Sequence, residues 1–507
     1  MSYQTSVRRW QRAIVDLDTN AANYPEVKDE ILKILKLRYD GLGESVQQCF
    51  QYCALFPEDS NIYKDMLVEY WIHEGIINEG GDRDIAAFNT GYGVISFLFA
   101  ACLLMPTGTS KFVKMHDVIR QMALWAASNF GEEEEKVIVK TGAGLQQMPE
   151  VRNWNAVKRM SLANNEIQNI SISPDCPNLT TLFLKDNKLV NISGDFFLSM
   201  PKLMILDLSS NQNLTKLPEE VSNLVSLRYL DLSGTSLENL PVGLGKLIQL
   251  RYFALTGVRT LQSLSVISSL VNIEMLLLDD TTLLSLELIE DIKLLKKLKG
   301  LGVTINDVMV LERLFSIPEL ARCIENISLD GVVAKDGPLQ LEKAMGSLRF
   351  ICIERCIMSD IMEHRRYGRR STCFENLVFV NFYEVSGVQD LSWLLFAPNL
   401  AFLRVKGPSP ELREIVSREK VSGILNEGSS IVPFRELRSI ILLNLEELKS
   451  IYWERLELPS LKNMNIAYCP ELKRLPLSKE RAYNFDLHEY GEEWFGGLEW
   501  EDEATED

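Results

Sequence analysis

Histidine and cysteine are the residues of this chain whose chemistry could support catalysis or metal binding. None of the four histidines lies in a recognisable metal or nucleophile arrangement: His73, His116, His364 and His488. The nine cysteines include two pairs with members four residues apart, but neither pair has a second one at zinc-finger spacing. We therefore expect no enzymatic activity, no metal site, and cysteines that are buried free thiols in a reducing compartment.

One glycine-rich segment, Gly243–Lys246, has a partial likeness to a phosphate-binding loop. Such a loop needs Ser or Thr directly after its lysine to bind magnesium, and Leu247 follows here. The segment also falls in a turn of a repeated pattern, whereas a phosphate loop connects a strand to a helix. Gly243–Lys246 therefore does not predict nucleotide binding.

Two sets of charged residues are candidates for binding a protein partner. Asp207 and Asp231 are one repeat apart, so we expect them to lie about 4.8 Å apart on neighbouring strands. The second set is a cluster of arginines in an acidic protein: Arg365, Arg366, Arg369 and Arg370. The aspartates could equally be ordinary repeat residues. The arginines could form a solvated loop, bind an acidic partner or clamp another part of the chain.

A repeated leucine pattern must position these side chains. Its clearest copy is Leu227–Leu237, with leucines at the first, fourth, sixth and eleventh positions and Thr235 at the ninth. This is typical of leucine-rich repeats, in which a short strand precedes a turn whose polar side chain bonds to backbone groups. Copies begin at Val157, Leu179, Leu203, Leu227, Leu250, Ile273, Leu298, Ile324, Leu348, Leu377, Leu400, Leu437 and Leu461.

The spacing of these copies supports a solenoid. Ten of the twelve intervals are 22–26 residues long, within the roughly 20–29 residues of this repeat class. The other two, of 29 and 37 residues, indicate loops. The side chains between the fixed leucines should project from one concave sheet suited to binding another protein. The sequence thus predicts an α/β leucine-rich-repeat solenoid (horseshoe) of about 13 irregular repeats.

The segment before the repeats reads as mostly helical. Ser45 and Gln48 have the spacing of a capping box that would open the second helix. Helices are expected over residues 26–40, 45–54, 63–74, 84–98 and 116–129. Leu103–Met105 and Phe112–Met115 predict a small β-hairpin, and Val137–Val139 a short strand.

Several helices with one hairpin suggest a winged-helix-like domain, which raises the question of DNA binding. The helix after the hairpin carries only Arg120 as a firm positive charge, whereas phosphate binding needs several basic side chains on one face. The net charge of −17 also argues against nucleic acid as a partner. We expect none.

The sequence shows no targeting signal that would direct the protein out of the cell or into a membrane. Residues 1–30 contain no apolar signal-peptide core. The longest apolar stretch, Val94–Met105, is twelve residues long, short of the roughly 20 that a membrane helix needs. Gly491–Asp507 carries eight acidic residues and reads as a solvated tail. We expect a cytoplasmic protein without a transmembrane segment.

Three motifs before the repeats carry a family resemblance. They are Cys49–Glu58 (Cys-Phe-Gln-Tyr-Cys-Ala-Leu-Phe-Pro-Glu), Tyr70–Gly75 (Tyr-Trp-Ile-His-Glu-Gly) and Met115–Asp117 (Met-His-Asp). In this order and followed by leucine-rich repeats, they resemble plant intracellular immune receptors of the coiled-coil, nucleotide-binding, leucine-rich-repeat type. The likeness covers nearly the whole chain, which resembles the C-terminal portion of such a receptor.

The resemblance implies a domain organisation and one nucleotide contact. His116 would contact the β-phosphate of ADP, and Asp117 would support the local structure of the motif. The family's phosphate loop and Walker B acid have no counterpart in this sequence, so we expect no cofactor, or ADP only if the remnant pocket suffices. The implied parts are 1–42, the end of a helical subdomain; 43–135, a winged-helix subdomain; 136–156, a linker or solenoid cap; 157–488, the repeats; and 489–507, an acidic tail.

Two functions remain open at this point. In the first, the protein resembles a disease resistance receptor, whose repeats bind a host or pathogen protein or restrain a nucleotide switch. A separate nucleotide-binding module would then be a further partner. In the second, it is a stand-alone intracellular scaffold or adaptor whose winged-helix part only covers the end of the solenoid.

Overall fold

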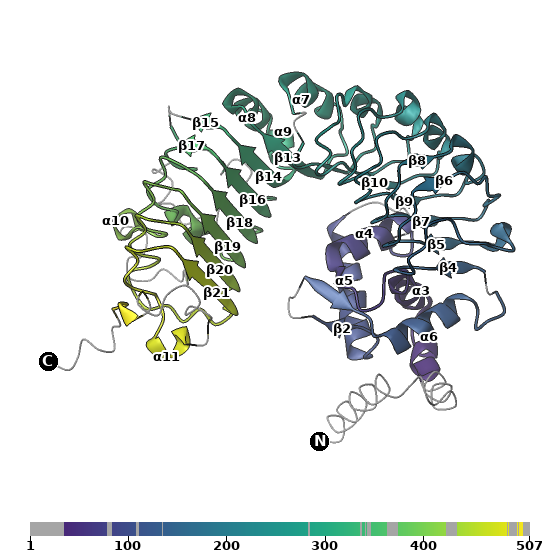
Figure 1. The fold of residues 1–507 in the computed structure, drawn as a ribbon, viewed down its shortest axis with the longest axis horizontal. Coiled ribbons are helices and arrows are strands. Elements are labelled where there is room, and N and C mark those ends of the chain that lie inside the picture. The colour runs from purple at the N-terminus through teal and green to yellow at the C-terminus, as the bar shows by residue number, and fades with distance from the viewer. Residues whose placement is uncertain are drawn as a thin grey trace. The chain divides into compact units, whose positions relative to one another are not determined.

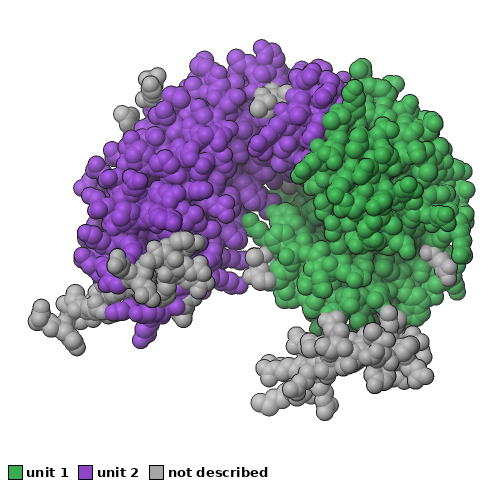
Figure 2. Space-filling view, in the orientation of Figure 1, with its two compact units in different colours: residues 1–231, 241–251 green, residues 232–240, 252–507 purple. Residues whose placement is uncertain are grey.

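The computed structural model describes residues 35–78, 84–107, 111–133, 135–281, 284–334, 337–339, 341, 346–361, 374–421, 433–483, 485, 494 and 496–499. They fall into two compact units, which Figure 2 colours separately. Unit 1 comprises residues 1–231 and 241–251, and unit 2 comprises residues 232–240 and 252–507. Unit 1 therefore combines the winged-helix part with the first repeats.

The winged-helix part of unit 1 has the predicted helices and hairpin. Its three strands form an antiparallel sheet in the order β1-β3-β2, in which Met105 pairs with Lys114. The first of these strands was not expected from the sequence. In chain order the elements are α3 (Glu44–Cys53), β1 (Ile62–Tyr63), α4 (Lys64–Glu74), α5 (Ile85–Ala100), β2 (Met105–Pro106), β3 (Phe112–Lys114) and α6 (Asp117–Ala127). Of the helix expected over 26–40, only residues 35–40 are described, and they are helical.

The ends of these helices correct one expectation. The prediction that Ser45 and Gln48 form a capping box is wrong. Helix α3 begins at Glu44, its N-cap residue is Gly43, and no side chain caps it. Ser45 is therefore already inside the first turn. Asp84, by contrast, caps α5, where its carboxylate accepts a hydrogen bond from the Ala87 amide at 2.6 Å.

The repeats of unit 1 form a parallel sheet in which side chains alternate between a packed and an outward-facing side. Its edge strand β4 is the predicted strand at 137–139 and pairs with β5. The strands, in spatial order, are β4 (Val137–Val139), β5 (Arg159–Ser161), β7 (Thr181–Phe183), β9 (Ile205–Asp207) and β10 (Tyr229–Asp231). A second pair, β6 (Asn169–Ile170) and β8 (Asn191–Ile192), and the 3₁₀ helices η2 (Trp154–Ala156), η3 (Gly194–Phe197), η4 (Glu219–Asn223) and η5 (Val242–Lys246) complete the coils.

Buried asparagines connect successive coils of unit 1. The Asn187 amide nitrogen donates to the carbonyl oxygens of Leu162 and Leu184, at 2.8 and 3.0 Å, and its oxygen accepts from the Ile167 amide. Asn165 and Asn211 make equivalent bonds at their own positions. The side chain at the ninth position of the repeat thus makes hydrogen bonds to backbone groups that are not paired between strands.

Unit 2 contains the later repeats, and each predicted copy contributes one strand to the parallel sheet (Figure 1). The strands are β11 (Tyr252–Ala254), β12 (Met275–Leu278), β13 (Gly300–Ile305), β14 (Ile324–Asp330), β16 (Phe350–Glu354), β18 (Phe379–Tyr383), β19 (Phe402–Lys406), β20 (Ser439–Leu443) and β21 (Asn463–Ala467). They are joined through the pair β15 (Val333–Ala334) and β17 (Ile357–Met358) and the helices η6 (Ser265–Ser269), α7 (Leu286–Ile292), α8 (Val308–Phe315), α9 (Pro318–Ala321), η9 (Ser392–Phe396), α10 (Arg418–Val421) and α11 (Lys479–Ala482).

The core of each unit consists of the fixed leucines and their apolar equivalents, such as Leu206, Leu230 and Leu403, which are at most 1% exposed. The eight cysteines in the described parts are free thiols; five are buried, as expected, whereas Cys102, Cys323 and Cys352 are half-buried. Within those same parts, no helix is both long enough and apolar enough to span a membrane.

Candidate functional site

The most extensively bonded polar site in unit 1 lies where α4 packs against the outward-facing side of the repeat strands. Glu74, the last residue of α4, is 8% exposed. Its Oε1 accepts a hydrogen bond from Nε of Arg159 in β5 at 2.7 Å and forms an ion pair with Nη2 of the same guanidinium, also at 2.7 Å. Its other oxygen, Oε2, accepts from the Thr181 hydroxyl in β7 at 2.8 Å. A carboxylate and a guanidinium, both removed from water, therefore connect the winged-helix part to two repeats.

The Arg159 guanidinium stays charged in this buried position. Burial by itself would lower the pKa of the Arg159 guanidinium, but the adjacent Glu74 carboxylate outweighs it, and the net pKa is raised. The pair is fixed in place by Thr180, whose hydroxyl lies 3.1 Å from Glu74 Oε1. Satisfied hydrogen bonds on both partners are what make a buried ion pair tolerable.

A second polar contact lies one turn earlier on α4. The Tyr70 hydroxyl donates to Asp207 Oδ2 in β9 at 2.7 Å. Burial, and then the Asp207 charge, raise the pKa of the Tyr70 phenol well above its ordinary value, so Tyr70 remains the donor. The other carboxylate oxygen of Asp207 accepts from the backbone amide and the hydroxyl of Ser209, at 3.0 and 2.6 Å.

Aromatic rings fill the space around these bonds. The Tyr70 ring lies 4.8 Å from both the Phe183 and the Tyr229 rings, measured between centroids. Tyr52 of α3 packs against Phe183 at 6.1 Å. We refer to Tyr70, Glu74, Arg159, Thr181 and Asp207 with these rings as the α4 interface.

The two aspartates proposed as a recognition site have different environments. Asp231 and Asp207 are direct register partners on neighbouring strands, as expected. Asp207, however, is only 1% exposed and is bonded to Tyr70, so its partner lies within the chain instead of outside it. Asp231 is half-buried, and its Oδ2 lies 3.4 Å from the Tyr229 hydroxyl. The sequence could not show that α4 covers this position.

His116 lies at the N-cap of α6 and is 8% exposed. Its Nδ1 accepts from the Val118 amide at 3.3 Å and lies 2.6 Å from Asp117 Oδ1, which accepts from the same amide at 2.7 Å. The Asp117 carboxylate therefore lies directly beside the imidazole at the start of the helix.

The basic side chains near His116 are already used inside the chain. The Arg120 guanidinium donates to the Phe56 carbonyl at 2.9 Å and to Glu58 at 3.0 Å, and Lys114 pairs with Asp59 at 2.8 Å. Among the residues that the structure describes, those beside His116 therefore do not by themselves form a cradle for a diphosphate. Because Arg120 is bonded within the chain, the permanent positive charge that the sequence showed on α6 is not available to bind DNA.

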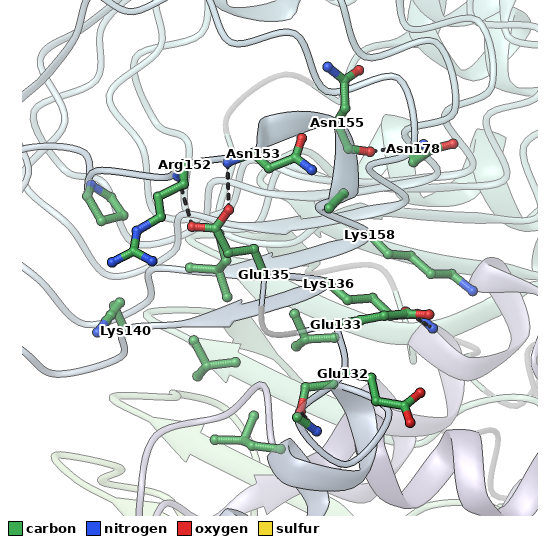
Figure 3. Close-up of a pocket in the computed structure, with 18 of the residues that line it drawn as sticks. Glu132, Glu133, Glu135, Lys136, Lys140, Arg152, Asn153, Asn155, Lys158 and Asn178 are labelled. Carbon is green, nitrogen blue, oxygen red and sulfur yellow. Dashed lines mark hydrogen bonds and ion pairs between the residues drawn. The ribbon is translucent and has the colours of Figure 1, made fainter.

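An open groove of about 1430 Å³ lies beside the edge strand β4 (Figure 3). Its rim includes Glu135, whose two oxygens accept from the backbone amides of Arg152 and Asn153. The lining mixes carboxylates and ammonium groups, among them Lys158, whose pKa is lowered chiefly by burial. His116 does not line this groove. Because the lining carries both acidic and basic groups, the groove does not favour a particular class of ligand.

Arg365, Arg366, Arg369 and Arg370 lie outside the described residues. In the parts of the chain that are described, no three His, Cys, Asp or Glu side chains are arranged to hold a metal ion.

Comparison with known proteins agrees with this architecture. Residues 55–123 match the winged helix domain of disease resistance proteins, and residues 177–237 match the leucine rich repeat. A putative disease resistance protein of Arabidopsis thaliana is 42% identical over 524 residues, covering 100% of this chain and 58% of the relative. Disease resistance protein RPS5 of the same plant is 42% identical over 521 residues, with the same coverage.

The similarity thus extends over the whole of this chain, including α4 and the first repeats, which form the α4 interface. The chain spans less than two thirds of the length of these relatives. It belongs to the family of plant disease resistance proteins and contains their winged-helix domain and leucine-rich repeats.

Proposed function

We propose that this chain is the sensing and restraining part of a plant immune receptor, in which the first repeats hold the winged-helix domain through the α4 interface. The observation that supports this is the buried Glu74–Arg159 pair, with its bonds to Thr180 and Thr181. A domain that only covered the end of the solenoid would need apolar contact but no ionised pair. Releasing α4 from the repeats is the two-state change that a partner would bias.

This function is tested by placing the chain in a relative that is named a disease resistance protein. The chain replaces the matching segment of Arabidopsis RPS5, and ion leakage from leaf tissue is measured without a pathogen. The unsubstituted chimera should be silent, whereas Glu74→Gln should release α4 and cause leakage. A matched control is Glu499→Gln, which removes an exposed ion pair with Arg474. If Glu74→Gln and the control behave alike, the repeats do not restrain the domain.

The alternative, a scaffold without switching activity, predicts a different result in the same experiment. Because α4 would then be a structural cover only, Glu74→Gln should reduce the stability of unit 1 and leave leaf tissue unaffected. The proposed site of action is the cytoplasm, where the free thiols of the described cysteines would stay reduced. We propose no enzymatic activity for the chain.

We further propose that the chain binds no nucleotide by itself. The surroundings of His116, with Asp117 at 2.6 Å and Arg120 bonded to Phe56 and Glu58, favour this. The check is to denature the purified chain and quantify released ADP and ATP. Stoichiometric ADP would contradict the proposal and make His116→Ala the next variant, since the resemblance assigns the β-phosphate contact to His116.

A further inference from the structure

A second set of aromatic and charged side chains lies on the outward-facing side of β16, β18 and β19 in unit 2. In each strand the side chains alternate, with the second and fourth residues buried and the first, third and fifth more exposed. Register pairs place the outward-facing residues in rows. We call these side chains the aromatic–arginine face: Phe350, Phe379, Phe402, Tyr383, Arg404 and Lys406.

One row of this face is entirely aromatic. Phe350, Phe379 and Phe402 are successive register partners, and each is half-buried. The rings of Phe350 and Phe379 lie 6.2 Å apart, at an interplanar angle of 43°. On the opposite side of the face, the Lys406 ammonium lies 5.2 Å from the centre of the Tyr383 ring. The face is therefore a partly apolar strip with the Lys406 ammonium at one end.

Arg404 is at the centre of this strip, in the middle of β19, and it is exposed. No hydrogen bond or ion pair joins its guanidinium to another residue in the described parts of unit 2. Two other arginines of the same unit are paired, Arg355 with Asp330 and Arg313 with Glu290. The carboxylate nearest in register, Glu354, is already bonded to Cys352 and lies 3.7 Å from Arg355.

The α4 interface in unit 1 shows what such a set of side chains can bind. There, repeat strands present Arg159 and aromatic rings, and α4 supplies a glutamate and a tyrosine to them. The aromatic–arginine face carries the same two kinds of side chain on equivalent strands, but its arginine has no carboxylate. Charge complementarity therefore favours a partner that places an anionic group opposite Arg404.

We propose that the aromatic–arginine face binds an acidic segment of a partner protein, with a carboxylate on the Arg404 guanidinium and apolar side chains on the phenylalanine row. Arginine and aromatic side chains are the residues that most often dominate protein interfaces, and guanidinium matches a carboxylate in bidentate geometry. The proposal rests on the function above, in which the repeats bind a protein, and it names the chemistry of that partner.

A single-stranded nucleic acid could also stack on aromatic rings. It is disfavoured here because Arg404 and Lys406 are the two cations of the face, and Glu354 projects from the same side of β16. Phosphate binding depends on several such charges acting together. A protein carboxylate needs only one well-placed guanidinium.

The test uses the whole chain and a defined probe. A fluorescein-labelled 12-residue peptide of alternating glutamate and leucine is compared by fluorescence anisotropy with the same peptide carrying glutamine for glutamate. The acidic peptide should bind more tightly, and Arg404→Gln should weaken it about tenfold. Phe379→Ala with Phe402→Ala should weaken both peptides, because the apolar contact is common to them. Arg355→Gln, which removes an arginine already paired with Asp330, is the matched control and should change neither.

Charge reversal gives an independent check. Arg404→Glu should abolish binding of the glutamate peptide and create binding of a lysine counterpart. Equal binding of acidic and glutamine peptides, an unchanged affinity in Arg404→Gln, or tighter binding of oligo-dT than of the acidic peptide would each overturn the proposal. Arg404 is exposed, so these variants should keep the unfolding temperature of the parent chain. The Glu74→Gln experiment does not involve this face, so a failure of either proposal can be told from a failure of the other.

Discussion

The carboxylate of Glu74, at the end of α4, lies 2.7 Å from the guanidinium of Arg159 in the first repeat strand. The two residues are 85 positions apart in the chain, and their side chains are 3% and 5% exposed. The pair therefore joins two parts of unit 1 that have separate sequence patterns. It also offers the most direct way to disturb one part through the other.

Removing one member of this pair should destabilise unit 1 strongly. Arg159→Met leaves Glu74 as an uncompensated buried charge, and we expect a loss of about 3–5 kcal/mol in the free energy of unfolding. Urea unfolding followed by tryptophan fluorescence would measure it. The double variant Arg159→Met with Glu74→Leu should recover at least half of the loss, because an apolar pair needs no ionic partner.

The control for that experiment is an exposed ion pair. Arg474 and Glu499 are 2.7 Å apart, with side chains 67% and 56% exposed. Arg474→Met should cost at most about 1 kcal/mol, since solvent screens such pairs. Equal losses for Arg159→Met and Arg474→Met would mean that the Glu74–Arg159 pair does not hold α4 in place.

The buried asparagines should matter more than the threonine that replaces them in a later repeat. Asn187→Ala leaves the carbonyl oxygens of Leu162 and Leu184 and the amide of Ile167 without their partner. We expect a loss of about 2–4 kcal/mol, from several unsatisfied buried groups. Thr235→Ala removes one bond, to the Leu232 carbonyl at 2.7 Å, and should cost about 1 kcal/mol. Chemical denaturation of both variants would show whether this order holds.

Asp279 should make the stability of unit 2 depend on pH. Burial raises the pKa of its carboxyl from the ordinary 3.8 to about 6, although a hydrogen bond from Asn326 opposes the shift. The folded protein therefore keeps a proton that the unfolded chain has already lost, so stability falls as the pH rises from about 4 to 6.

Asp279→Asn should remove that slope and stabilise the protein above pH 6 by about 1–3 kcal/mol. Thermal unfolding between pH 4 and 8 would test this, with Asp195→Asn, at an exposed position, as the control. Parallel pH profiles for the parent chain and Asp279→Asn would rule out the ionisation of Asp279 as the cause.

The repeat strands could be predicted because their signal is local and periodic. Leucine positions recur at nearly constant spacing, and each of the thirteen copies contributes one strand to the long parallel sheet. Details that depend on a neighbouring coil could not be predicted from this period. One is the shift in pairing between β13 and β14, next to Leu301 and Gly302. Another is the start of α3 at Glu44 instead of at the Ser45 capping box, since both positions suit a helix N-terminus.

The sequence by itself therefore determined the fold class, the order of the helices and the hairpin, and the residues that face the core, because burying an apolar pattern has few solutions. The tertiary structure alone decided which polar side chains on the sheet are covered and which are open. Asp207 and Arg159 are buried because α4 packs over them, whereas Arg404 occupies a similar outward-facing position and is exposed. Burial of a charge depends on segments far away in the chain, and no local spacing records them.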